Sequence, residues 1–200
     1  MKNRKITKVL ALFLSVIAMT ACGKSVKTLP GEKQITYSEL KTSVNEKLPL
    51  NLYDKCHETG SRVIKYDTQE RTFTYDANLT YDPLFGTYVG SGSGDYITPQ
   101  NALEIADGIK VEFSIFGVKE DDVKYYSADT GYRIFVDVNI SLDVEGVQIS
   151  GYIKMNAIFN EFGWSTYESA EIYQEGRVQG SKQTQTQTTL VEFAYSESTK

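Results

Sequence analysis

The clearest pattern in the chain is a nearly perfect alternation of apolar and polar positions in residues 132–142. Between residues 132 and 142 the apolar positions are Tyr132, Ile134, Val136, Val138, Ile140 and Leu142. The alternation resumes at Val147 and continues to Ala157, which predicts a β-hairpin. A four-residue loop over 143–146 would place Leu142 opposite Val147 and keep both apolar sets on one face.

Residues 164–173 predict a third strand after this hairpin. Glu168 falls on its apolar side, which indicates a bulge or a sheet edge. Residues 183–195 alternate Gln and Thr before an apolar end, and we interpret them as a terminal edge strand with a frayed tip. Alternation over 109–115 predicts one more strand.

The region before residue 90 also indicates strands. Residues 62–66 and 71–75 are rich in β-branched and aromatic side chains, and residues 67–70 suit a hairpin loop between them. Residues 78–89 could pair next, although Asp82-Pro83 interrupts that segment.

Two helices are predicted. Thr36 and Glu39 have the spacing of a capping box, and an apolar stripe follows before Pro49 ends the helix: Tyr37, Leu40, Val44 and Leu48. A shorter second helix is expected from Thr98 as N-cap, with Pro99 at the first helical position and Gly108 after its end.

These elements predict an α+β fold, a mainly antiparallel curled β-meander with two short helices. Strands of ten residues extend about 33 Å, so we expect the sheet to curl around the first helix. The element order over 98–178 resembles cystatin-like and nuclear-transport-factor-like α+β folds, and a β-sandwich is the alternative. We expect a single domain over 36–200, which could divide into subdomains 36–96 and 97–200.

The N-terminus adds a cellular location to this picture. A basic start is followed by an apolar run from Val9 to Met19, which is too short to span a bilayer as a helix. The ending Met19-Thr20-Ala21-Cys22 resembles the lipobox of bacterial lipoproteins. That resemblance implies a signal peptide over 1–21, a lipid on Cys22 (palmitate among its acyl chains) and life on the extracytoplasmic face of the cell membrane, or on the outer membrane of a two-membrane cell. Residues 22–35 would then form a lipidated tether.

The net charge of the chain limits the classes of partner that it can bind. Without residues 1–21 the chain has 17 Lys and Arg against 26 Asp and Glu, a formal charge of −9. An acidic surface repels phosphate backbones, so we expect no nucleic-acid partner. Membrane attachment is therefore expected from the lipid on Cys22.

The remaining candidate chemistry is sparse. Lipidation of Cys22 leaves Cys56 without a disulfide partner, and Cys56 is either a reactive thiol or a small buried side chain. His57 is the only histidine, and its neighbour Cys56 would point to the opposite side of a strand. No calcium-loop or nucleophile-elbow spacing occurs, so we predict no cofactor, no metal and no enzymatic activity.

Tyrosine is the one outlier, with 14 residues in 200. Tyr75, Tyr81, Asp82 and Tyr88 are candidate ligand-binding residues, because aromatic rings beside carboxylates suit glycans and protein interfaces. The alternative is that these rings are half-buried strand positions.

The sequence thus predicts a non-catalytic lipoprotein that binds or scaffolds an envelope protein or glycan. A solute- or glycan-binding lipoprotein is the alternative, and an envelope hydrolase with paired carboxylates is a third.

Overall fold

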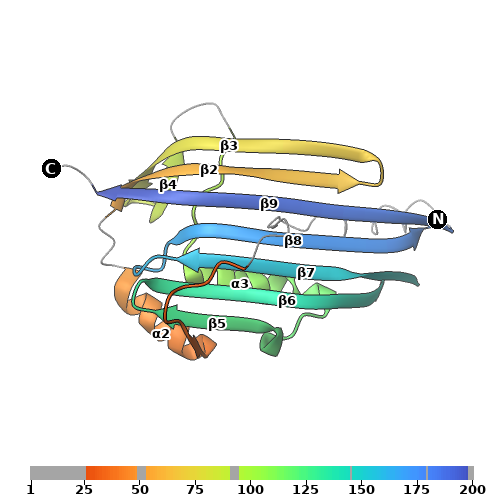
Figure 1. Ribbon diagram of the computed structural model, residues 1–200, viewed down its shortest axis with the longest axis horizontal. Helices are drawn as coiled ribbons and strands as arrows, with labels where there is room; N and C mark the ends of the chain where they lie inside the picture. The colour runs from red at the N-terminus through yellow and green to blue at the C-terminus, as the bar shows by residue number, and fades with distance from the viewer. Residues whose placement is uncertain (1–25, 49–52, 91–94, 145, 179, 198–200) are drawn as a thin grey trace.

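The computed structural model describes residues 26–48, 53–90, 95–144, 146–178 and 180–197, so Cys22 and the lipobox-like ending lie outside the described residues. The described chain forms a nine-stranded antiparallel sheet with two α-helices (Figure 1). The strands are β1 (Lys33–Ile35), β2 (Tyr53–Tyr66), β3 (Gln69–Asp82), β4 (Thr87–Gly90), β5 (Val123–Ala128), β6 (Gly131–Val144), β7 (Val147–Phe159), β8 (Ser165–Val178) and β9 (Ser181–Glu197). The helices are α2 (Tyr37–Lys47) and α3 (Ala102–Glu112), with single 3₁₀ turns η2 (Ser114–Phe116) and η3 (Glu120–Asp122). The predicted α+β class is confirmed.

The last strand joins the two halves of the chain. The strand order is β1-β5-β6-β7-β8-β9-β2-β3-β4, so β9 lies between β8 and β2; it pairs with β8 over residues 181–192 and with β2 over residues 185–197. Neither β8 nor β9 is therefore an edge strand, and that part of the prediction is wrong. Residues before 96 and after 97 contribute to one continuous sheet.

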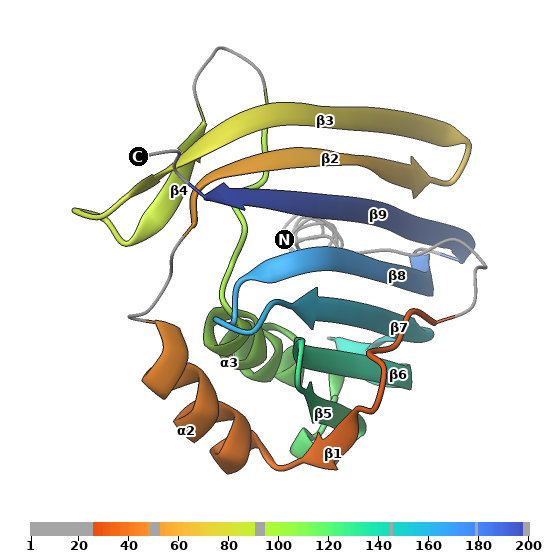
Figure 2. The ribbon, with the colours of Figure 1, turned by 60° about the vertical axis from the view of Figure 1, so that its left-hand side comes forward.

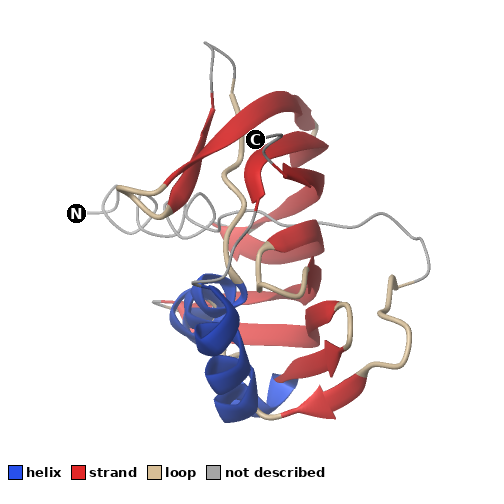
Figure 3. Ribbon diagram, turned by 90° about the vertical axis from the view of Figure 1, so that its left-hand side faces the viewer, coloured by secondary structure: helices blue, strands red, loops and turns tan. Residues whose placement is uncertain are grey.

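The sheet is open rather than curled. Its two edges, β1 and β4, are only three and four residues long and lie at opposite ends of the strand order, so they do not close on each other. Both helices lie on one side of the sheet, which we call the helix side, and we call the other side the outer side (Figure 3). The sheet is one layer of strands faced by helices, which differs from both the predicted curl and the alternative sandwich.

Helix α2 follows its sequence signal closely. The Thr36 hydroxyl accepts a hydrogen bond from the Glu39 amide, and the Glu39 carboxylate accepts one from the Thr36 amide. Leu40 and Val44, four residues apart, are fully buried. The predicted capping box and apolar stripe are confirmed.

Helix α3 starts three residues later than Thr98. Asn101 is the N-cap, since its side chain accepts hydrogen bonds from the Leu103 and Glu104 amides, and Glu104 completes a capping box. The helix continues through Gly108 to Glu112, so the strand predicted over 109–115 is wrong. Ile109, Phe113 and Phe116 lie four and three residues apart, a helical spacing that alternation over the same segment concealed.

Both predicted hairpin loops are shorter than expected. Val144 pairs with Val147 and Leu142 with Ile149, so two residues connect β6 to β7 instead of four. Relative to the predicted register β7 is shifted by two residues, which preserves the face of every side chain because the strand period is two. In the same way, Tyr66 pairs with Gln69 and leaves a two-residue loop between β2 and β3.

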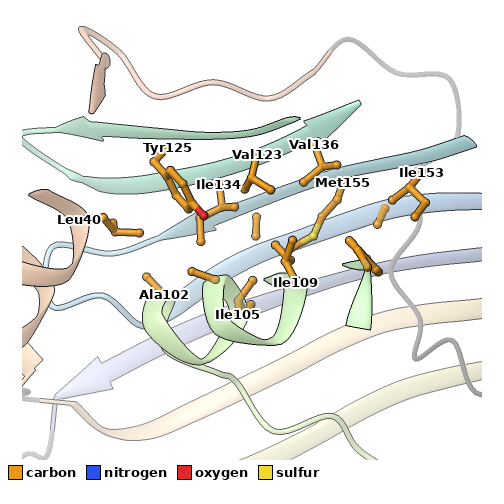
Figure 4. Packing of buried hydrophobic residues seen from close by; sticks show 14 of the residues in the cluster. Leu40, Ala102, Ile105, Ile109, Val123, Tyr125, Ile134, Val136, Ile153 and Met155 are labelled. Atoms are coloured by element: carbon orange, nitrogen blue, oxygen red, sulfur yellow. The ribbon is translucent and has the colours of Figure 1, made fainter. Parts of the chain in front are cut away.

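The main hydrophobic core lies between the helices and the β5–β7 part of the sheet. Figure 4 shows Ile105 and Ile109 of α3 facing Ile134, Val136 and Met155 of the sheet. A second cluster around Trp164 packs at the β3–β4 end of the sheet.

Candidate functional site

The helix side of the sheet has two unlike halves. Both described helices lie against the half formed by β5 to β7 (Figure 2). On the other half, six neighbouring positions of β2, β8 and β9 that face the helix side are polar. We call this set the polar half-face, and it consists of Arg62, Gln174, Gln183, Gln185, Gln187 and Thr189.

Register brings these six side chains together. Thr189 lies opposite Arg62 on β2, and Gln185 lies opposite Gln174 on β8. The four members on β9 alternate along the strand, so they share one face and form a row about 20 Å long. Strands β2 and β8 lie about 4.8 Å to either side of it. The polar half-face is therefore a continuous patch.

Several polar atoms of this patch are buried without a hydrogen-bond partner. Gln174 and Thr189 are each 2% exposed, and the Gln174 Nε2 and Thr189 Oγ1 atoms are unpaired. The Arg62 Nε and Gln183 Oε1 atoms are buried and unpaired as well. An unpaired buried polar atom costs about 1–3 kcal/mol, so four in one patch require an explanation. Bound ligand groups that hydrogen-bond to them would offset that cost.

Two buried carboxyl groups lie beside the polar half-face on the same side of the sheet. Glu58 of β2 pairs with Phe193 and Glu168 of β8 pairs with Val191, so β9 runs between them. Glu58 is fully buried and Glu168 is 4% exposed. The sequence predicted that Glu168 lies on the apolar side of its strand, and the structure places it on that side.

Burial dominates the titration of both groups. The pKa of Glu168 is raised to about 7, chiefly by loss of hydration; the hydrogen bond from the Ser165 hydroxyl opposes the shift and the nearby Glu58 carboxylate adds to it. Loss of hydration also raises the pKa of Glu58 to about 7, against the hydrogen bond donated by the Ile97 amide. Both groups therefore exchange protons near neutral pH.

Each carboxyl group also has a structural partner. Glu58 Oε1 accepts a hydrogen bond from the Ile97 amide at 2.8 Å, which fastens the segment before α3 to the sheet. Glu168 accepts a bond from the Ser165 hydroxyl at the start of β8. Glu58 Oε2 remains buried and unpaired, so this carboxyl group adds a further acceptor beside the polar half-face.

The tyrosines predicted to form a binding platform lie in a packed aromatic cluster. The rings of Tyr81 and Tyr88 are 5.2 Å apart, and Tyr88 lies 5.3 Å from Trp164 in an edge-to-face arrangement. Tyr75 and Tyr88 are buried, whereas Tyr81 is partly exposed. Asp82 accepts a hydrogen bond from the Leu84 amide and so shapes the β3–β4 turn. Packing therefore accounts for the buried rings, and Tyr81 and Asp82 are the two that solvent reaches.

Cys56 and His57 point to opposite sides of β2, as their adjacency predicted. Cys56 is buried in the aromatic cluster, and burial raises the pKa of its thiol to about 12. His57 lies on the outer side, with Nδ1 3.0 Å from Asn78 Oδ1 and Nε2 3.5 Å from an Asp76 carboxylate oxygen. At neutral pH the thiol is protonated and a poor nucleophile.

Comparisons with known proteins identify no family for this chain. No family model matches the chain, and no curated protein or solved structure matches it. Within the described residues, His, Cys, Asp and Glu side chains form no group of three placed to hold a metal ion. None of the described helices is long and apolar enough to cross a membrane.

Sequence reasoning missed the polar half-face. The alternating Gln and Thr of residues 183–189 suggested a frayed edge, whereas β9 is a central strand. The available signal was the alternation itself, because Gln183, Gln185 and Gln187 share one face of any strand. The position of that face beside β2 and β8 could not be inferred locally.

Proposed function

We propose that this protein is a membrane-anchored extracytoplasmic lipoprotein with a non-catalytic binding role at the cell envelope. Its ligand is a polar solute or glycan held on the polar half-face. The observation that carries the binding proposal is the group of buried, unpaired polar atoms on β2, β8 and β9. The anchor rests on the lipobox-like ending at Cys22.

The chemistry of the patch favours an uncharged ligand rich in hydroxyl groups. Arg62 and Gln174 offer donors, Gln183 offers an acceptor and Thr189 can do either. A sugar hydroxyl both donates and accepts, so one ligand class matches the whole set. Phe73 lies opposite Arg62 on β3 and is 36% exposed, which supplies an aromatic ring for the apolar face of a sugar.

A scaffolding role toward an envelope protein is the second candidate. It is favoured by Leu84 and Phe85 at the turn between β3 and β4, which are 89% and 79% exposed. Two adjacent, exposed apolar side chains on a turn suit a pocket on a protein partner.

A hydrolase that uses Glu58 and Glu168 is supported less well. Catalysis by paired carboxyl groups requires both to reach a substrate bond. Here one carboxyl group fastens the Ile97 amide and the other bonds to Ser165 within the protein interior. We assign them a structural and electrostatic role.

The binding proposal is tested by thermal unfolding of the mature chain in detergent micelles. The panel comprises neutral oligosaccharides, peptidoglycan fragments, small polar solutes and calcium. A ligand at 100 times its dissociation constant should stabilise the fold by about 2.7 kcal/mol. Thr189→Val should weaken that stabilisation, whereas Thr186→Val, on the outer side of the same strand, should leave it unchanged. Equal effects of the two variants would refute binding at the polar half-face.

The anchor is tested by incorporation of labelled fatty acid in a bacterial host. Cys22→Ser should abolish labelling and leave an uncleaved precursor. Cys56→Ser is the matched control, because it removes the other cysteine and should leave labelling intact. Labelling that survives Cys22→Ser would overturn the lipoprotein assignment.

A further inference from the structure

The described residues that precede the first helix pack against the sheet. We call residues 27–35 the strap. The strap ends in β1, which pairs with β5 from Lys33↔Ser127 to Ile35↔Tyr125. The sequence assigned 22–35 to a tether and started the domain at residue 36, so the folded part begins earlier than predicted.

The strap is fastened on the outer side by a buried ion pair. Arg133 of β6 donates from both Nε and Nη2 to the Glu32 carboxylate, and the two side chains are 5% and 15% exposed. The bond to Arg133 lowers the pKa of Glu32, so the pair is charged at neutral pH. The Arg133 guanidinium also stacks on Tyr126, with 4.0 Å between its carbon and the ring centre. A bidentate pair between a buried arginine and a carboxylate fixes both position and direction.

The start of the strap is held over the middle of the sheet. The Lys27 carbonyl accepts a hydrogen bond from Asn156 of β7 at 2.8 Å. The Lys27 ammonium lies 4.3 Å from the ring centre of Tyr167 on β8 and 3.5 Å from Glu192 on β9. Figure 3 shows the segment that precedes β1 on the side of the sheet opposite the helices.

Only five peptide steps separate Lys27 from Cys22. A fully extended chain of that length reaches at most about 17 Å. The Lys27 backbone is held by Asn156 of β7, which is three strands from the β1 edge, about 14 Å at 4.8 Å per strand, and three residues from the end of β7, about 10 Å. Crossing the thickness of the sheet with its side chains adds about 10 Å, so either path to the helix side is longer than about 17 Å. The lipidated residue therefore cannot reach the helix side by either path.

We propose that the strap orients the domain on the membrane, with the outer side of the sheet toward the lipid surface and the helix side away from it. This inference rests on the proposed lipid on Cys22. The polar half-face then faces away from the bilayer, where an extracytoplasmic ligand can reach it. Only residues 23–26 separate the strap from the lipidated residue, and we call them the spacer.

The experiment uses the mature chain from Cys22, coupled through the Cys22 thiol to a maleimide phospholipid and bound to phosphatidylcholine vesicles. Cys56 is buried and protonated, so it does not compete for coupling. A fluorescent non-natural amino acid replaces either Lys154, exposed on the outer side of β7, or Lys41, exposed on α2. The vesicles carry a quencher on the lipid headgroups.

Quenching should be several-fold stronger for the probe at position 154 than for the probe at position 41. A matched variant carries a 20-residue Gly/Ser linker between Ser25 and Val26, which leaves the strap contacts intact and lengthens the spacer. In that variant the two positions should be quenched equally. Equal quenching without the linker, or stronger quenching at position 41, would overturn the proposal.

Arg133→Ala provides a second route, because it should free the strap and reduce the difference between the two positions. Chemical coupling supplies the lipid in every case, so this test gives an answer whatever the cell attaches to Cys22. Acylation in the cell is measured separately with Cys22→Ser. A failure of the orientation and a failure of the lipoprotein assignment are thus distinguishable.

Discussion

The two halves of the helix side belong to the same antiparallel sheet and differ in the polarity of their side chains. A single row across the sheet makes the contrast visible: Arg62, Thr189, Ala170, Met155 and Val136 are successive neighbours on β2, β9, β8, β7 and β6. The Met155 and Val136 end packs under α3, and the Arg62 and Thr189 end presents buried polar atoms. Backbone pairing therefore builds the sheet, while side-chain polarity decides which half becomes core and which half becomes a candidate site.

The largest expected effect comes from truncating the apolar half. Ile153 is fully buried in the main core. Ile153→Ala should lower the free energy of unfolding by about 2–5 kcal/mol, because it leaves a cavity under the helices. Urea unfolding measures the change, and a loss below 1 kcal/mol would mean that this half is not tightly packed.

A change in stability of similar size is expected with pH, from the two buried carboxyl groups beside the polar half-face. The folded state holds protons on Glu58 and Glu168 up to a pKa of about 7, whereas the unfolded chain releases them near 4.5. Stability should therefore fall as pH rises from 4.5 to 7, by about 3 kcal/mol for Glu168 alone. Urea unfolding at pH 5 and pH 8 measures the difference.

Glu168→Gln should reduce this pH dependence, since glutamine does not titrate, and should leave the part contributed by Glu58. The stability contributed by the Glu32–Arg133 pair changes with pH in the opposite direction. Because Arg133 lowers the pKa of Glu32, that contribution is lost only as the pH falls below 4.5. The two windows do not overlap. An unchanged slope in Glu168→Gln would assign the pH effect to other groups.

A smaller change in stability should show whether Thr189 belongs to a binding site or to the packed core. Thr189→Val removes a buried, unpaired hydroxyl while keeping the side-chain volume. Without ligand the variant should be as stable as the original chain or up to about 1 kcal/mol more stable, because no hydrogen bond is lost. A destabilised Thr189→Val protein would show that the hydroxyl has a partner in the folded chain.

The smallest effect is expected on the outer side of the same strand. Leu190 is 38% exposed and directly precedes the fully buried Val191. Leu190→Thr should change stability by no more than about 0.5 kcal/mol in urea unfolding, whereas Val191→Ala should cost clearly more. Similar values for both would place the strand in a different register.

Sequence reasoning anticipated the parts of this fold that short-range spacing encodes. The α2 capping box, the alternation of β6 and β7 and the opposite sides of Cys56 and His57 all follow from periods of 3.6 and 2.0 within one segment. The β6–β7 hairpin was also assigned correctly, with an error of two residues in its register. Such an error changes no side chain's face, which is why the pattern alone could not detect it.

Tertiary structure decided which strands meet. The pattern of residues 183–195 does not indicate that β9 lies between β8 and β2, because β2 is more than a hundred residues away and local spacing does not encode such a pairing. That placement turns a Gln-Thr alternation into the centre of the polar half-face and brings Glu58 and Glu168 to either side of β9. It likewise fastens the strap to Arg133. The sequence by itself determined the periods, the caps and the candidate anchor at Cys22, and the long-range pairing of strands determined where the candidate site lies.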